Sequence, residues 1–168
     1  CHSNVFVFQT FYVYSKIRET VGEDIERNPE LIDNDMFFND VIKRVTEKEK
    51  IVISEKNKDD IKDYIERYIL GYGKIDDLIR DKDVNGIYCN GLHNPIKIDH
   101  LYYGRMDTDL EFSSNFEINE IISKFARKAG QLINQNNPIL DVTLEKGYSI
   151  QAILGGNFTD SKFVIKKS

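Results

Sequence analysis

The spacing of hydrophobic positions divides the chain into a helical first part and a second part with strand-like alternation. Apolar residues recur every three or four positions over about 34–49 and 57–70, which predicts two helices. The continuous apolar and aromatic run at 5–14 predicts a strand buried on both faces. A short helix and a turn are expected over 15–29, and a short strand or an extended link at 51–53. The first part is therefore predicted to be mostly helical.

After Gly71 the apolar positions alternate with a period of two, and two helical stretches interrupt the alternation. We expect a short helix over 74–81 and a long one over 114–133, which Ser114 and Glu117 open as a capping box. The predicted strands cover 86–89, 96–98 and 106–112, and three more follow within 139–165.

Together these elements predict an α+β fold: a helical N-terminal part followed by a mixed or antiparallel sheet packed on one long helix. Gly71-Tyr72-Gly73 interrupts the pattern, because two glycines so close together end a helix. We place a domain boundary there, between a mostly helical subdomain at 1–70 and an α/β domain at 71–168.

The composition of the 168 residues is that of a globular protein, with 40% hydrophobic and 30% charged side chains. The formal net charge of -5 argues against nucleic acid as a partner, because such partners usually require a basic surface. No apolar run reaches the ~18 residues that span a bilayer, and the run at 5–14 lacks the flanks of a signal peptide. The two cysteines, Cys1 and Cys89, give no disulfide framework, which fits a reducing, cytoplasmic compartment.

Both ends of the sequence suggest a piece of a longer protein. It begins at Cys1 rather than at a methionine, and it stops at Lys166-Lys167-Ser168 directly after a strand-like run. It contains no G-x-x-x-x-G-K-[ST] phosphate loop, no G-x-G-x-x-G, no C-x-x-C and no H-E-x-x-H. The chain by itself is therefore expected not to hydrolyse ATP, and no catalytic residue is assigned.

Several residues could in principle hold a metal ion. Cys89, His93 and His100 are zinc-ligand types, but a closed zinc site needs a fourth ligand that the spacing does not supply. Asp107 and Asp109 lie two apart on a predicted strand and could share a divalent ion. Solvated carboxylates and a buried thiol are the more ordinary roles for these residue types, so no metal site is predicted.

Two further groups of charged residues have alternative roles. Asp141 follows Pro138-Ile139-Leu140 and is either a catalytic carboxylate or, more ordinarily, a turn-stabilising one. Lys162, Lys166 and Lys167 form a basic C-terminal end. This end is either simply exposed or directed at a phosphate that a following domain holds.

The segment from Gly71 to Lys167 contains an ordered set of short motifs. They are Leu70-Gly71-Tyr72-Gly73-Lys74-Ile75-Asp76-Asp77-Leu78, Ile87-Tyr88-Cys89-Asn90-Gly91, Asn94-Pro95-Ile96 with Asp99-His100, Tyr103-Gly104 with Thr108, Asn137-Pro138-Ile139-Leu140-Asp141 to Leu144, and Phe163-Val164-Ile165-Lys166-Lys167. In order and spacing, this set resembles the N-terminal domain of the type II and type IV secretion ATPases, in particular the archaeal branch that powers secretion, pilus and archaellum assembly. The part before Tyr64 resembles the family only loosely.

The resemblance implies a homo-hexameric motor in which this domain precedes a RecA-type ATPase domain and closes over ATP and Mg²⁺ bound there. It also implies a membrane platform protein as partner, on which the rocking domains would push. The expected location is the cytoplasm, at the periphery of the cell membrane. This chain would be the assembly and regulatory half, without a cofactor of its own.

Two positions depart from the family pattern. Ser149 stands where the family has the arginine of Pro-Asp-Gly-Ser-Arg, and Lys166 stands where the closing motif has an arginine. An arginine offers phosphate a planar fork of donors, a lysine offers a point charge, and a serine offers no charge. We therefore expect Lys166 and Lys167 to make the nucleotide-side contacts, with Ser149 marking the degenerate position.

Two other interpretations follow from the same residues. The missing arginines also fit a stand-alone α+β interaction or scaffold module that needs no nucleotide, which a phosphate loop further along the same gene would exclude. A small metal-dependent enzyme would have to use Asp107, Asp109, His93 and His100.

Overall fold

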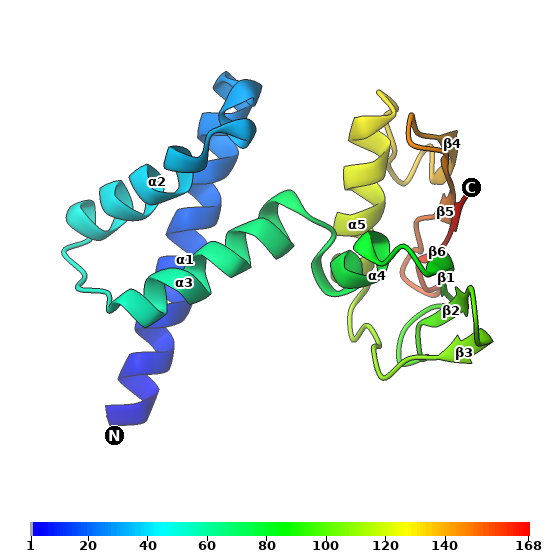
Figure 1. The fold of residues 1–168 in the computed structure, drawn as a ribbon, viewed down its shortest axis with the longest axis horizontal. Coiled ribbons are helices and arrows are strands. Elements are labelled where there is room, and N and C mark those ends of the chain that lie inside the picture. The colour runs from blue at the N-terminus through cyan, green and yellow to red at the C-terminus, as the bar shows by residue number, and fades with distance from the viewer. Residues whose placement is uncertain (1) are drawn as a thin grey trace. The chain divides into compact units, whose positions relative to one another are not determined.

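The computed structural model describes residues 2–168, and of residues 2–11, 32, 33 and 35 it describes the backbone only. The chain divides into two compact units, unit 1 at Cys1–Gly73 and unit 2 at Lys74–Ser168 (Figure 1). The expectation of an unpaired thiol at Cys1 lies outside the described residues. The fold is α+β, with a helical N-terminal part and a six-stranded antiparallel sheet.

Unit 1 is built from helices. They are α1 at His2–Arg27, a 3-10 turn at Pro29–Asp33, α2 at Asp35–Lys48, α3 at Glu55–Tyr64 and a π-helical continuation at Ile65–Leu70. The two helices predicted over 34–49 and 57–70 are thereby confirmed, and the second changes to π-helical geometry in its last six residues.

The predicted strand at 5–14 is wrong, because α1 runs through that segment and on to Arg27 without a break. Val13, Ile17 and Val21 are buried and lie four residues apart, which places them on one face of a helix. Burial of this stripe outweighs the β-propensity of the aromatic and β-branched run, since tertiary packing commonly overrides local preference. The separate short helix expected over 15–29 is therefore the second half of α1.

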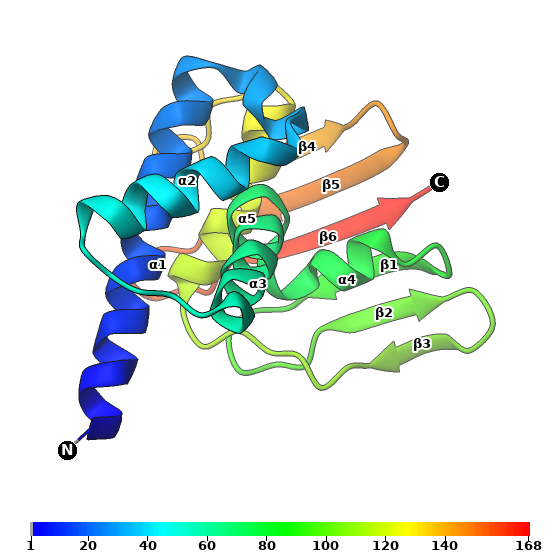
Figure 2. The same cartoon turned by 60° about the vertical axis from the view of Figure 1, so that its left-hand side comes forward.

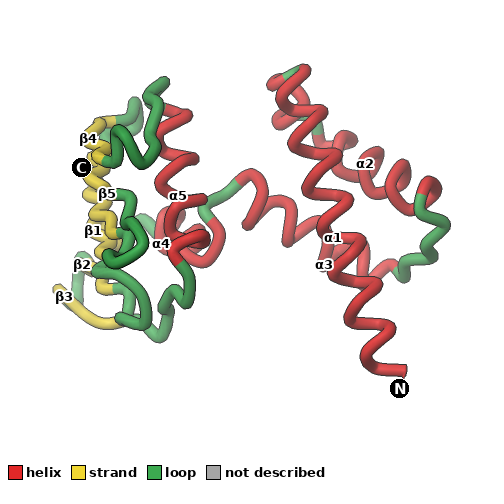
Figure 3. Tube along the Cα trace, turned by 180° about the vertical axis from the view of Figure 1, so that it is seen from behind, coloured by secondary structure: helices red, strands yellow, loops and turns green. Residues whose placement is uncertain are grey.

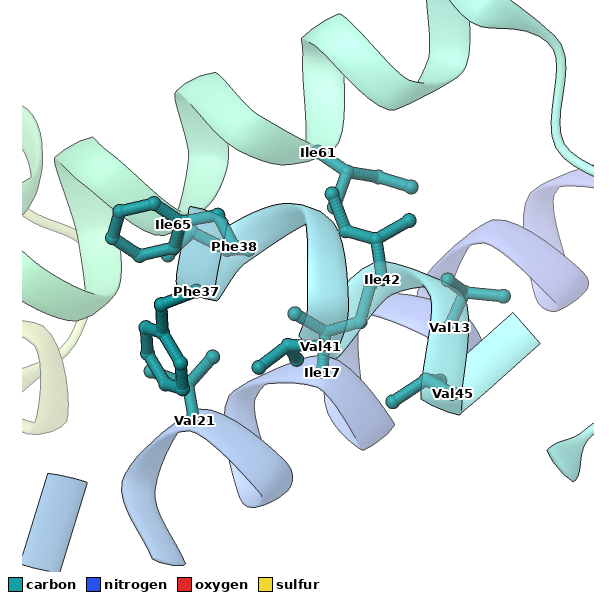
Figure 4. Packing of buried hydrophobic residues seen from close by; sticks show 10 residues of the cluster. All are labelled: Val13, Ile17, Val21, Phe37, Phe38, Val41, Ile42, Val45, Ile61 and Ile65. Carbon is teal, nitrogen blue, oxygen red and sulfur yellow. The ribbon is translucent and has the colours of Figure 1, made fainter. Parts of the chain in front are cut away.

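The three helices of unit 1 share one apolar core (Figure 4). Ile17 and Val21 of α1, Val41 of α2 and Ile65 have no solvent-exposed surface. Each such side chain contributes about 1.5–3 kcal/mol when it leaves water. The core is completed by Val13, Phe37, Phe38, Ile42, Val45 and Ile61.

Residues 51–54 are neither helix nor strand and lead into α3. Ser54 caps the helix, because its hydroxyl accepts a hydrogen bond from the Asn57 amide at 3.3 Å. Of the two alternatives expected for 51–53, the structure has the link and not the strand, and Ile51 and Ile53 pack against the helical core.

Unit 2 is a sheet with helices on one face. Its helices are α4 at Asp76–Arg80, preceded by a 3-10 turn at Gly73–Ile75, and α5 at Asn115–Lys128. Its strands are β1 at Val84–Cys89, β2 at Lys97–His100, β3 at Gly104–Asp107, β4 at Ile139–Thr143, β5 at Tyr148–Ile153 and β6 at Lys162–Lys167. The strand order is β3-β2-β1-β6-β5-β4, and every neighbouring pair is antiparallel.

The two faces of this sheet differ in what lies on them. Helices α4 and α5 lie on the same side of the strands, as Figures 2 and 3 show from different directions. We call this side the covered face, and its inward residues include Ile87, Ile150, Phe163 and Ile165, all buried. We call the opposite side the open face, because no helix of unit 2 covers it; the structure describes every residue of this unit.

Two element boundaries in unit 2 differ from the predictions. The strand expected over 106–112 lies at Gly104–Asp107, because it pairs with β2 in a hairpin that runs from His100 to Gly104. The helix expected over 114–133 begins at the predicted capping box, where Ser114 accepts from the Glu117 amide, but ends at Lys128. Gly130 takes a left-handed φ of 67° just after it, which is a common way for a helix to stop.

Candidate functional site

A line of four polar residues and one glycine crosses five strands on the open face. The backbone register pairs Ser149 of β5 with Lys166 of β6, and Lys166 with Gly86 of β1. It then pairs Gly86 with Asp99 of β2, and Asp99 with Arg105 of β3. We call these five residues the polar row. Because directly paired residues of antiparallel strands point to the same face, the row forms one continuous surface feature.

At one end of the polar row, three side chains form a compact hydrogen-bonded cluster. Arg105 donates from Nε to Asp99 Oδ1 at 2.8 Å and from Nη2 to Asp99 Oδ2 at 3.1 Å. Tyr88 donates its hydroxyl proton to Asp99 Oδ2 at 2.5 Å. The Arg105 guanidinium also lies 4.3 Å from the centre of the Tyr88 ring. The two-point ion pair and the aromatic ring together hold the guanidinium in one orientation.

The cluster depends on the absence of a side chain at Gly86. A Cβ at this position would lie 2.9 Å from Asp99 Oδ2 and 3.1 Å from the Tyr88 hydroxyl oxygen. Both distances are shorter than a comfortable carbon–oxygen contact, so a larger residue here would displace Tyr88 or Asp99. The glycine therefore leaves the space above β1 that Tyr88 and Asp99 occupy.

The electrostatics of the cluster follow from these contacts. The hydrogen bonds from Arg105, and after them the one from Tyr88, hold the pKa of the Asp99 carboxyl below its usual value. The positive charge of Lys166 acts on Asp99 in the same direction. The hydrogen bond to Asp99 raises the pKa of Tyr88, so the phenol stays protonated and continues to donate.

Two of the three predicted nucleotide contacts lie side by side in this row. Ser149 and Lys166 are direct cross-strand partners, and the Lys166 side chain is exposed. Among the described residues, no hydrogen bond or ion pair engages the Lys166 ammonium group. In the sequence these two residues lie in separate segments, and the pairing of β5 with β6 places them side by side.

The third predicted contact, Lys167, lies on the covered face. Its Nζ donates to the backbone carbonyl oxygens of Leu78 at 2.8 Å and Asp81 at 2.7 Å, at the end of α4. Burial lowers the pKa of this ammonium group. A lysine at the C-terminal end of a helix satisfies carbonyl groups that have no partner within the helix. Lys167 therefore links β6 to α4.

The residues considered as metal ligands are not brought together. No group of three or more His, Cys, Asp or Glu residues among those described is arranged to hold a metal ion. Cys89 is buried, and burial raises the pKa of its thiol. His100 accepts a hydrogen bond from the Tyr102 amide at its Nδ1. Asp107 lies 3.7 Å from the Lys97 ammonium, whereas Asp109 lies beyond the end of β3.

The remaining charged candidates lie elsewhere on the open face. Asp141 is exposed on the edge strand β4 and pairs with Gln151. Lys162 is exposed at the start of β6, four residues before Lys166. Neither residue makes a contact with the polar row among the interactions that the structure describes.

Sequence reasoning missed three residues of the site: Tyr88, Asp99 and Arg105. The strand alternation contained a signal for the first two, because Tyr88 lies between the inward residues Ile87 and Cys89 and Asp99 follows the inward residue Ile98. It contained no signal for their convergence. That depends on the register of three strands, with a local irregularity between Val84 and Gly86.

The last two residues of the Ile87-Tyr88-Cys89-Asn90-Gly91 motif, which follow β1, have a structural role. Gly91 has a φ of 110°, and a Cβ there would lie 2.6 Å from Asp160 Oδ2. The same carboxylate oxygen accepts a hydrogen bond from the Leu92 amide at 3.0 Å. The Asn90-Gly91 turn thus ties the end of β1 to the loop that precedes β6.

Comparisons with curated proteins found relatives without an assigned function. No family model matches the chain. The uncharacterized protein MJ1288 of Methanocaldococcus jannaschii is 25% identical over 151 residues, which is 88% of this chain and 60% of that protein. The uncharacterized protein MJ0900 of the same organism is 25% identical over 160 residues, or 91% of this chain and 26% of that protein. An uncharacterized protein of Bacillus anthracis is 28% identical over 141 residues, which is 78% of this chain and 32% of that protein.

The chain thus spans less than two thirds of the length of each of these relatives. Among solved structures, it is similar to the VirB11 ATPase from the Brucella suis type IV secretion system, solved in complex with sulphate. The TM-score is 0.45 and the sequence identity 15%, over 55% of this chain and 28% of that one. The likeness to this secretion ATPase is loose and partial.

Proposed function

We propose that this chain is the N-terminal domain of a secretion or pilus-type assembly ATPase, and that its open face closes over ATP bound to a following RecA-type domain. The ordered motifs between Gly71 and Lys167 support the family assignment. In this proposal the complete protein is a homo-hexamer that binds Mg²⁺ with ATP. It works in the cytoplasm beside the cell membrane, where it pushes on a platform protein.

One observation carries the proposal. Ser149 and Lys166, the two positions at which the family pattern has arginines, are direct cross-strand partners on the open face. Two separate motifs thus converge on one exposed surface, as expected if both face the same ligand. The exposed, unengaged ammonium group of Lys166 can donate to a phosphate oxygen without first giving up another partner.

The roles of the three predicted contacts differ in this proposal. Lys166 supplies the positive charge, and Ser149 supplies at most a neutral hydroxyl donor. Lys167 acts from the other face by fixing β6 to α4. A direct nucleotide contact from Lys167 would require its ammonium group to leave two carbonyl oxygens.

The test is turnover by the product of the whole gene beside this 168-residue chain, each with and without ATP and Mg²⁺. We expect ATP hydrolysis and a nucleotide-stabilised hexamer from the whole product only, because the chain itself has no phosphate loop. We expect Lys166→Gln to lower turnover roughly tenfold, as the loss of one charge-assisted hydrogen bond predicts. Ser149→Arg should raise it. A whole product that stays monomeric and inactive would overturn the proposal.

A second function, a scaffold module without nucleotide dependence, is favoured by one comparison. In MJ1288 the chain outside the match is shorter than the match itself, whereas in the other two relatives it is longer. A relative with so little additional chain has less room for a following catalytic domain. If the scaffold function holds, partner binding by the whole product would be the same with and without ATP.

A further inference from the structure

We propose that Arg105 is a phosphate-binding residue of the polar row, which Tyr88 and Asp99 hold in position and which acts together with Lys166 on one oxyanion. This inference rests on the proposed function, in which a phosphate-bearing ligand lies over the open face. It adds a residue from a different strand and from outside the motifs that carry the family resemblance.

The register places the two cations on either side of Gly86 and Asp99. Lys166 and Arg105 belong to the same polar row, with Gly86 and Asp99 between them. Because neighbouring strands lie ~4.8 Å apart, the Cα atoms of these two residues are about 14 Å apart. Both side chains are long enough to reach inward, and Arg105 already does so, because its guanidinium lies over the Tyr88 ring of β1. The space above Gly86 holds the Asp99 carboxylate and the Tyr88 hydroxyl, so an oxyanion shared by the two cations would lie further out, above this pair.

The hydrogen bonds leave part of the guanidinium available. Arginine has five N–H donors in a planar fork, and Asp99 accepts from Nε and from Nη2. These two hydrogen bonds use one edge of the fork, and the outer edge can face a tetrahedral oxyanion. The Asp99 pair and the Tyr88 ring remove rotamer freedom in advance, so less entropy is lost when a ligand binds.

The charge balance of the row also favours an anion. Asp99 lies between two cations, and its own charge is directed at Arg105. The neighbouring pair of Lys97 and Asp107 is balanced, with its charged atoms 3.7 Å apart. Lys166 has no such counter-charge among the described residues, so the row carries one positive charge in excess. That charge attracts an oxyanion, and Arg105 adds the two-donor geometry that Lys166 lacks.

Tyr88 and Asp99 are positioning residues in this arrangement. Tyr88 stacks below the guanidinium and donates to the carboxylate oxygen that accepts from Arg105 Nη2. Loss of the Tyr88 hydroxyl would free Asp99 to turn, and Arg105 would turn with it. Tyr88→Phe should therefore weaken oxyanion binding although it removes no group that touches the ligand.

The experiment is a titration of the 168-residue chain with inorganic phosphate, ATP and adenosine, followed by NMR at the amides of Gly86 and Lys166. We expect phosphate and ATP to bind and adenosine not to bind. Arg105→Gln should weaken both ligands roughly tenfold, the usual cost of a lost charge-assisted hydrogen bond. Tyr88→Phe should weaken them less. Arg127→Gln is the matched control, because it removes an exposed arginine from the last turn of α5 and should change nothing.

Each other outcome has a defined meaning. If Lys166→Gln weakens ATP binding but Arg105→Gln does not, the inference fails and the proposed function stands. If Arg105→Gln weakens phosphate binding while the whole gene product has no ATPase activity, the site exists and the proposed function fails. Absence of phosphate and ATP binding to the chain overturns the inference. Should Arg105→Gln lower the thermal midpoint, Arg105→Lys, which keeps the charge and loses the fork, should still bind ATP more weakly.

Discussion

The covered and open faces of the sheet use the same six strands for different purposes. On the covered face, Ile87, Ile150 and Ile165 are cross-strand neighbours and have no exposed surface. On the open face, the residues adjacent to these three in the chain, Gly86, Ser149 and Lys166, are neighbours. The covered face is constrained by burial, because any polar residue there would lose its hydration. The open face is free of that constraint, so its cluster of Tyr88 and Asp99 around Arg105 requires another explanation.

Unit 1 provides a second contrast. Its described interactions are dominated by an apolar core, and its ion pairs, such as Lys16 with Glu19 and Lys58 with Glu55, lie on exposed helix surfaces. Such pairs contribute little to stability. The open face of unit 2 differs, because Tyr88 donates a hydrogen bond to the Arg105–Asp99 ion pair there and Gly86 leaves room for both Tyr88 and Asp99. A polar network that packing does not require is the stronger indication of function.

The largest expected effect is a difference in stability between alanine variants of two adjacent residues, one on each face of β6. Phe163 is buried and packs edge-on against Phe112, whereas Val164 points to the open face and is half-buried. Phe163→Ala should lower the free energy of unfolding by about 3–5 kcal/mol, and Val164→Ala by about 1 kcal/mol or less. Urea unfolding of both variants measures the difference. Equal losses would contradict the assignment of the faces.

An intermediate effect on stability is expected when the two adjacent lysines, Lys166 and Lys167, are replaced one at a time. Lys167→Met leaves the carbonyl oxygens of Leu78 and Asp81 without their donor and should cost about 1 kcal/mol of stability. Lys166→Met, the same change on the open face, should leave the unfolding midpoint almost unchanged and weaken ATP binding. Thermal unfolding and ATP titration of the two variants separate a structural lysine from a ligand-binding one. A Lys167→Met variant as stable as the parent chain would contradict the structural role assigned to Lys167.

The smallest effect concerns the acid titration of Asp99. Its pKa is lowered in the folded state, so the carboxylate contributes stability above the unfolded value of about 3.9 and loses it as the pH falls toward the folded value. Arg105→Gln removes the largest cause and should raise the pKa of Asp99 toward that unfolded value. The stability gap between variant and parent should then be present at neutral pH and narrow in acid. Carbon-13 NMR of the Asp99 carboxyl measures the pKa directly, and an unchanged value would show that Arg105 does not control it.

Much of the fold was predictable because its signals are local. The helices over 34–49 and 57–70 and the capping box at Ser114 follow from spacing and from residues three positions apart. The strand at 5–14 was predicted wrongly because its residues favour β-structure locally. The helical stripe from Val13 to Val21 outweighs that preference only when α2 packs against it.

The candidate site was predictable only in part, for the same reason. Ser149 and Lys166 were found as departures within motifs, each judged from its own few neighbours along the chain. Their direct pairing, and the position of Lys167 on the opposite face, required the register of β5 and β6. Arg105 was missed altogether because its partners Asp99 and Tyr88 belong to two other strands.

The sequence by itself determined the α+β class, the helical first part and the residues that alternate between the two faces of each strand. These depend on spacing along one chain segment, which hydrophobic burial and backbone geometry convert directly into helices and strands. Only the tertiary structure decided which strand lies beside which, and therefore that Ser149, Lys166, Gly86, Asp99 and Arg105 form one row. A sheet joins residues by hydrogen bonds between distant segments, and a shift of one residue in any pairing would move its side chains to the other face.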